Sequence, residues 1–198
     1  MQSLLPFLLF AFVATITPGP TNILALSHGA RFGLRATLPL VLGACLGAAL
    51  IVLLVGLGLG ETLLRYPRVQ QAMSWLGALW LSGLAWQLWR SAATPLNTEA
   101  GSQRELGPLG AAALQLVNPK VWMMAVAVIS VFAAGSADKA PRVLQLSLIF
   151  LALAVPSMSA WALLGAGSAR LLQSPRRMKR FNQGLALLLL ASTWLALL

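Results

Sequence analysis

Acidic residues are scarce in this chain, which has 4 Asp or Glu against 14 Lys or Arg in 198 residues. Only 9% of the residues are charged, 59% are hydrophobic, and the mean hydropathy is +0.82. So little polar surface cannot cover a water-soluble globule, and that class is excluded. The composition therefore predicts a polytopic membrane protein.

Reactive side chains are equally few, since the chain has one cysteine, Cys45, and one histidine, His28. A single thiol excludes a disulfide framework or a cysteine-based metal site within one chain, and we interpret Cys45 as a small packing residue. His28 could relay protons or could simply lie at the membrane interface. With few groups left for acid–base or metal chemistry, we expect no enzyme activity, no metal and no cofactor.

Six apolar segments are long enough to approach the roughly 20 residues that cross a bilayer core. They cover residues 4–26, 37–60, 72–88, 109–134, 143–165 and 182–198. We predict an all-α membrane protein with six transmembrane helices. The third segment is weakened by tryptophans and Gln87, and the sixth is close to the minimum length, so five spans stay open. No Lys or Arg precedes the first segment, which we expect to remain as a span and not to be a cleaved signal.

Basic residues are distributed unevenly between the loops. Loops one, three and five hold Arg31, Arg35, Arg90, Arg104, Arg170, Arg176, Arg177, Lys179 and Arg180, whereas loops two and four hold Arg65, Arg68, Lys139 and Arg142. This bias predicts that the first set is cytoplasmic and that both termini are periplasmic. The cluster at 176–180 either contacts anionic lipid or only anchors the topology. No basic helix stands apart from the apolar segments, so the net charge of +10 does not indicate nucleic-acid binding.

Three spans in each half would run the two halves in opposite directions through the bilayer, which is inverted-repeat geometry. We predict a first three-helix repeat over residues 1–90 and a second over residues 109–198. Residues 91–108, rich in small and polar residues, form the expected cytoplasmic linker.

Proline motifs interrupt the first and fourth segments at matching places. They are Thr17-Pro18-Gly19-Pro20-Thr21-Asn22 and Asn118-Pro119-Lys120. Proline ends the helical hydrogen-bond ladder and frees backbone groups, which membranes tolerate only where protein or water meets them. A new half-helix then begins at Pro20, capped by Thr17 or Gly19, and another at Pro119, capped by Asn118. Such breaks mark a transporter's binding site or are packing kinks.

A carboxylate is the ligand favoured by two half-helix N-termini and a nearby cation. Lys120 supplies that cation unless its long stem reaches the cytoplasmic surface. Asn22 and Gln115 would orient a substrate or repair the broken backbone. The predicted substrate-binding residues are Thr17, Pro18, Gly19, Pro20, Asn22, Gln115, Asn118, Pro119 and Lys120.

Small and hydroxyl residues indicate where helices approach one another. Gly43 and Gly47 form a small-xxx-small pair, either within the chain or between protomers of a homodimer. We expect Ser157 and Ser159, beside a further break at Pro156, to make contacts between helices.

The first proline motif, continued by Ile23-Leu24-Ala25-Leu26 and followed by Gly33, Gly43 and Gly47, resembles the signature of the LysE/RhtB family of amino-acid exporters. Leu114-Gln115-Leu116-Val117-Asn118-Pro119-Lys120 is similar to that family's second motif, and the pattern is most similar to the cysteine and O-acetylserine exporter branch. The resemblance implies an inner-membrane protein that expels small amino acids, driven by the proton gradient. Two features depart from the family: Thr21 stands where many members have Asn, and the second segment lacks the acid that some branches carry, which argues against a dibasic substrate.

The sequence thus leads to one main hypothesis, a secondary transporter that exports small neutral amino acids of the cysteine, O-acetylserine or homoserine and threonine type. Its expected partners are the amino acid, the lipid bilayer and protons, in an antiport cycle. The alternative is a non-transporting membrane scaffold or assembly factor, which would need no polar cavity.

Overall fold

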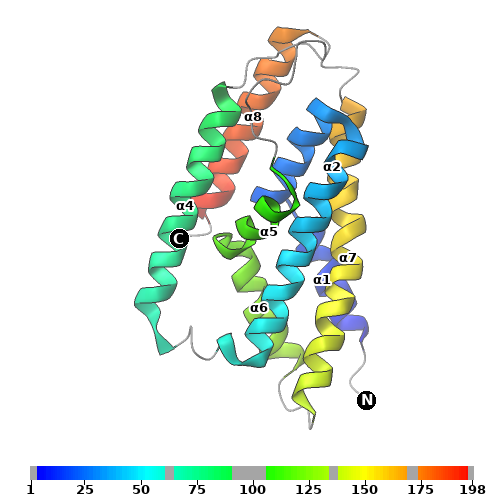
Figure 1. The fold of residues 1–198 in the computed structure, drawn as a ribbon, viewed down its shortest axis with the longest axis vertical. Coiled ribbons are helices and arrows are strands. Elements are labelled where there is room, and N and C mark those ends of the chain that lie inside the picture. Colours follow the sequence, from blue (N-terminus) through cyan, green and yellow to red (C-terminus); the bar gives the residue numbers. More distant parts are fainter. Residues whose placement is uncertain (1–3, 61–64, 91–105, 134–137, 169–173, 196–198) are drawn as a thin grey trace.

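The structure is a computed structural model that describes residues 4–60, 65–90, 106–133, 138–168 and 174–195 (Figure 1). Within these ranges the chain is helical, which confirms the predicted all-α fold. The elements are α1 (Leu5–Ile16), α2 (Pro20–Leu54), the π-helical turn η1 (Val55–Leu59), α4 (Pro67–Arg90), α5 (Pro108–Leu116), α6 (Pro119–Phe132), α7 (Lys139–Ser168) and α8 (Pro175–Trp194). The expected linker falls mainly at residues 91–105, outside the described residues.

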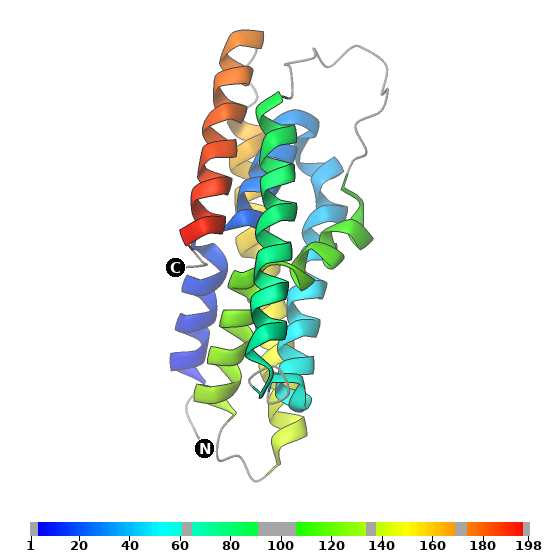
Figure 2. The same cartoon turned by 90° about the vertical axis from the view of Figure 1, so that its left-hand side faces the viewer.

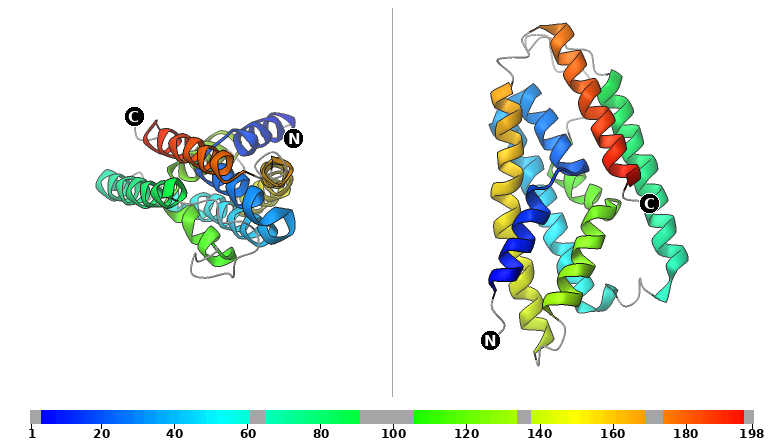
Figure 3. Two further views of the ribbon diagram at one scale, coloured as in Figure 1. Left: turned by 90° about the horizontal axis from the view of Figure 1, so that it is seen from above. Right: turned by 180° about the vertical axis from the view of Figure 1, so that it is seen from behind.

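Helix α2 is two helices joined at a sharp reversal. Gly33 has φ 82° and ψ 171°, a left-handed conformation that glycine adopts without the steric cost of a Cβ. The chain rises along α1 and the first limb of α2, turns at Gly33, and descends along the second limb (Figures 1 and 3). The 35-residue element is therefore divided where the first two predicted segments were separated.

The later helices also alternate in direction along the long axis of the molecule (Figure 2). Helix α4 rises, the bent pair α5 and α6 descends, α7 rises and α8 descends. The bend between α5 and α6 is 67°. Among the described helices, α2 with η1 and α7 are each long and apolar enough to span a membrane, and α5 with α6 passes as a broken pair. Six spans remain a prediction, and α4 and α8 are the segments that the sequence had marked as weak.

Helix contacts are made close by small residues. Gly29 of α2 lies against the backbone of Ala162 in α7, and Gly165 lies against the Leu26 carbonyl. Gly43 contacts the Pro108 backbone, and a Cβ added at Gly47 would lie 2.8 Å from the Ala112 carbonyl oxygen. The predicted Gly43 and Gly47 contact is therefore within the chain, between α2 and α5.

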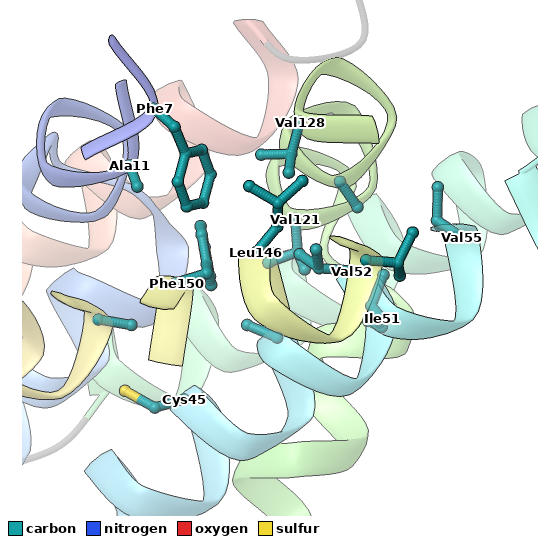
Figure 4. Close-up of a cluster of buried hydrophobic side chains, with 14 of the residues drawn as sticks. Phe7, Ala11, Cys45, Ile51, Val52, Val55, Val121, Val128, Leu146 and Phe150 are labelled. Carbon is teal, nitrogen blue, oxygen red and sulfur yellow. The ribbon is translucent and has the colours of Figure 1, made fainter. Parts of the chain in front are cut away.

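A buried apolar cluster joins α1, α2, η1, α6 and α7 (Figure 4). Phe7 and Phe150 are its largest side chains, and Phe7 meets the ring of Phe132 at a centroid distance of 5.3 Å. Because α1 and α6 flank the two breaks, this cluster fixes one side of each.

The expected break at Pro156 is wrong, because α7 is one continuous helix from Lys139 to Ser168. Helix α7 packs closely at both ends, with Gly29 against Ala162 and Gly56 against Val143. The helix thus continues through Pro156, although that residue removes one backbone hydrogen bond, and it packs against α2 and η1 on the two sides of the proline.

Large apolar side chains are also exposed in stripes. Leu42, Leu46 and Leu50 lie one turn apart on α2 and are 47%, 55% and 53% exposed. An apolar stripe of this kind needs a nonpolar surrounding. Together with the apolar composition, it agrees with a protein embedded in lipid.

Candidate functional site

Both predicted breaks are present and each opens a new helix. Gly19 and Asn118 are the N-caps of α2 and α6, and Pro20 and Pro119 are buried at the first helical positions. The Asn118 side chain accepts a hydrogen bond from the Lys120 amide at 3.2 Å, which confirms its predicted cap role. Gly19 caps α2 with no side-chain bond, so the alternative cap, Thr17, is not used.

The first break frees three consecutive carbonyls at the end of α1, because a helix leaves its last carbonyls without internal partners. The Thr15 carbonyl accepts from Asn22 Nδ2 at 3.0 Å. The Ile16 carbonyl accepts from Trp161 Nε1 at 3.0 Å. The Thr17 carbonyl accepts from Lys120 Nζ at 2.5 Å. Donors from α2, α7 and α6 thus converge on one broken turn.

The second break is joined to the first by a buried side-chain network. Thr21 Oγ1 lies 3.2 Å from Gln115 Oε1 and accepts from Asn118 Nδ2 at 3.0 Å. Gln115 Nε2 donates to the Ala111 carbonyl at 2.8 Å. Gln115 and Asn118 are 1% and 2% exposed, so this network has little contact with solvent. Gln115 thus binds backbone within its own helix α5 and the side chain of Thr21, and the two roles predicted for it stay predictions.

A small pocket, with a cavity volume of about 40 Å³, opens beside the breaks. Its lining includes Gly19, Pro20, Asn22, Gln115, Asn118 and Lys120 from the predicted set. The side chains of Thr17 and Pro18 are exposed and Pro119 is buried, and none of the three lines the pocket. Thr17 takes part only through the contacts of its carbonyl with Lys120.

Sequence reasoning missed most of the remaining wall, which comes from α1, α2, α6 and α7. It consists of Ala14, Thr15, Thr21, Ala44, Cys45, Ala48, Val121, Met124, Phe150, Ala154 and Met158. Cys45 packs in the apolar cluster, as predicted, and also faces the pocket. Ala44 and Ala48 lie one turn apart on α2, a spacing that could have indicated a shared face. Nothing local in the sequence points to Phe150 or Met158.

Thr15 also connects the site to α7. Its Oγ1 lies 3.0 Å from Ser157 Oγ, and both residues are buried. The predicted interhelical contact of Ser157 is thereby confirmed.

The half-buried side chain of Lys120 extends from α6 across the first break. Its ammonium meets α1 at the helix C-terminus, where the macrodipole is negative. A Cβ added at Gly19 would lie 2.8 Å from Lys120 Cδ and 3.2 Å from Nζ, so the lysine stem needs the space that glycine leaves. Asp138 is exposed before α7, and the other three acids lie outside the described residues. No carboxylate of the described residues lines the pocket.

His28 lies away from this pocket, at the Gly33 reversal. Its Nδ1 is 3.0 Å from Thr37 Oγ1, and its ring lies against the ring of Phe32, with a centroid distance of 4.5 Å and a tilt of 46°. Thr37 Oγ1 donates to the Gly33 carbonyl at 2.8 Å, so its oxygen can accept the His28 N–H. The contact supports the turn between the two limbs of α2.

Comparison with known proteins agrees with this architecture. Residues 12–196 match the family model described as LysE type translocator. An uncharacterized membrane protein of Vibrio cholerae is 30% identical over 181 residues, covering 90% of this chain and 88% of the relative. A cysteine/O-acetylserine efflux protein of Shigella flexneri is 32% identical over 190 residues, covering 93% and 94%. One of the same name from Klebsiella pneumoniae is 31% identical over 163 residues, covering 80% of each.

No solved structure matches this chain. The family groups translocators, which confirms the prediction that the protein is not an enzyme. Since the family match covers nearly the whole chain and the proline breaks lie within it, this membrane protein belongs to the LysE type translocator family.

Proposed function

We propose that this chain is a secondary transporter that exports small neutral, zwitterionic amino acids or close derivatives. The observation that carries the proposal is the meeting of two broken helices at one pocket, with Lys120 reaching from the second break to the first. The relatives named as cysteine/O-acetylserine efflux proteins support the same substrate class.

The substrate carboxylate is held between Lys120 and the first turn of α2. The first amides of a helix have no internal acceptors, and the dipole there is positive. The backbone amides of Thr21 and Asn22 belong to that turn, beside the pocket. The nitrogen of the Asn22 side chain is committed to the Thr15 carbonyl, which leaves its oxygen to accept from a substrate ammonium group.

The substrate side chain lies against the apolar wall. Ala44, Ala48 and Ala154 leave room there, and Phe150 and Met158 complete the surface. An uncharged side chain fits this wall, whereas a second ammonium group would find no carboxylate among the described lining residues.

Alternating access follows from two inverted three-helix repeats, residues 1–90 and 109–198, that form six spans. The helices that correspond in the two repeats pack in pairs, α2 with α7 and α4 with α8. The broken pairs run in opposite directions, α1 with the first limb of α2 upward and α5 with α6 downward (Figures 1 and 2). Rocking of one repeat against the other exposes the pocket to each side in turn.

We assign the end of the molecule that holds the Gly33 reversal to the cytoplasm of the bacterial inner membrane. Arg31, Arg35, Arg90 and the start of α8 lie at that end (Figure 1). The positive-inside rule then places both termini in the periplasm. Alkaline phosphatase fused to either terminus should be active. Inactive fusions at both termini would show that the orientation is the opposite one.

Efflux of labelled cysteine or O-acetylserine from loaded proteoliposomes tests the function. We expect efflux by the wild type that rises with an imposed pH gradient, since we propose proton coupling. Lys120→Met should lower transport by about tenfold or more, the value of a charge-assisted hydrogen bond. Lys179→Met, at an exposed position on α8, is the matched control and should transport normally.

Each alternative gives a different result. Undiminished transport by Lys120→Met removes the lysine from the site, and indifference to the pH gradient removes proton coupling. A folded wild-type protein that moves no neutral amino acid, and that tolerates Pro18→Ala together with Pro119→Ala, is a scaffold instead.

A further inference from the structure

The Lys120 side chain ends in a primary ammonium, the group that amino acids other than proline carry at the α-carbon. In the structure this primary ammonium binds the Thr17 carbonyl at 2.5 Å, at the edge of the pocket lined by Gly19 and Asn22. A carbonyl that holds one alkylammonium group can hold another, because the donor geometry is the same.

The surroundings of the Thr17 carbonyl favour any cation, and nothing in them is specific for lysine. Helix α1 ends at Ile16, and its negative dipole end points to this break. The preceding carbonyls of Thr15 and Ile16 are taken by the neutral donors of Asn22 and Trp161. The Thr17 carbonyl is thus the acceptor of this turn that a positive charge occupies.

The lysine can leave this acceptor without moving the helices. Its stem is long and flexible, and it passes over Gly19, where only the missing Cβ gives it room. The first-turn amides of α2, where a carboxylate would bind, begin two residues further along the chain at Thr21. The ammonium therefore needs only side-chain rotation to pair with a carboxylate there.

We propose, on the basis of the proposed function, that the Lys120 ammonium and the α-ammonium of the transported amino acid compete for the Thr17 carbonyl. When the amino acid binds, Lys120 turns to its carboxylate and the substrate ammonium takes the carbonyl. The exchange removes a direct bond between the two repeats, since Thr17 belongs to the first and Lys120 to the second. The substrate thereby replaces a link that otherwise joins the repeats.

Three thiol ligands distinguish the contribution of the ligand's carboxylate from that of its ammonium group. L-cysteine has both, cysteamine lacks the carboxylate, and 3-mercaptopropionate lacks the ammonium. Their affinities are measured by calorimetry, under reducing conditions, for the purified full chain in lipid nanodiscs. In Lys120→Met we expect the affinity for 3-mercaptopropionate to fall about tenfold or more. The affinity for cysteamine should rise by a similar factor, because its competitor is gone. The affinity for cysteine should change less, because cysteine loses the partner of its carboxylate but also the competitor of its ammonium.

A second variant keeps the lysine but moves it. In Gly19→Ala the new Cβ would lie 2.8 Å from Lys120 Cδ, so the flexible stem must shift away from Thr17. The backbone tolerates alanine there, since φ is −154°. We expect a smaller gain in cysteamine affinity and retained binding of 3-mercaptopropionate. Lys179→Met serves as the control and should match the wild type for all three ligands.

A gain of cysteamine affinity in Gly19→Ala, which keeps the Lys120 charge, is a result that lost charge repulsion or a merely structural lysine would not produce. The inference is overturned if the wild type binds cysteine but the affinity of Lys120→Met for cysteamine is unchanged or lowered. That outcome leaves the proposed function in place. Failure of the wild type to bind any small neutral amino acid overturns the proposed function and this inference with it.

Discussion

Two glycines on the same helix give the sharpest test of how the second break is held. Gly77 and Gly83 are both in α4, six residues apart. A Cβ added at Gly77 would run into the backbone carbonyl of Val117, in the turn between α5 and α6, whereas a Cβ at Gly83 would meet nothing within 4 Å. The two sites therefore differ in packing while sharing the same helix.

The expected magnitudes follow from two opposing effects. Alanine is favoured over glycine inside a helix by about 0.5–1 kcal/mol, and this gain applies to both variants. Overpacking against a backbone atom that cannot rotate away costs about 1–3 kcal/mol, and this applies to Gly77→Ala alone. Gly83→Ala should be slightly more stable than the wild type. Gly77→Ala should be less stable than Gly83→Ala by about 1–3 kcal/mol.

Thermal unfolding of both variants in the same detergent measures this difference directly. At about 2–4 °C per kcal/mol for a chain of this size, the two midpoints should be separated by several degrees. Transport should also fall in Gly77→Ala, because a shift of Val117 moves the adjacent cap Asn118. Equal midpoints for the two variants would refute the close contact between α4 and the second break.

Two further predictions concern the polar contacts at the breaks. Asn118→Ala should lower the free energy of unfolding by about 1–3 kcal/mol, because it removes an N-cap and a buried bond to Thr21. Asn118→Ser should lose less in thermal unfolding, and an equal loss would mean that the cap contributes nothing. A double-mutant cycle of Thr15→Val with Ser157→Ala should give a coupling of about 0.6 kcal/mol, as for other hydrogen bonds between membrane helices. A coupling of zero would show that the two hydroxyls do not interact.

The sequence alone located the interruptions and what begins after them. Proline and glycine act on their own backbone, so Pro20 and Pro119 mark the first residues of α2 and α6 wherever those helices pack. Asn118 could be assigned as a cap for the same local reason. The membrane environment followed from composition, which does not depend on packing.

Partners far apart in sequence were beyond such reasoning. Trp161 donates to the Ile16 carbonyl across 145 residues, and no periodicity in either segment indicates that contact. The alanine and methionine wall of the pocket exists only because the second limb of α2 and α7 lie side by side. The same packing keeps α7 continuous at Pro156, where local propensity had predicted a break.

Local chemistry therefore determined where this chain stops being a regular helix. Tertiary packing decided which donors meet the carbonyls released there, and that Lys120 is one of them, 103 residues from the Thr17 carbonyl that it binds. The physical reason is that a helix end exposes its backbone groups whatever surrounds it, whereas a hydrogen bond to those groups forms only between segments that the fold brings within reach.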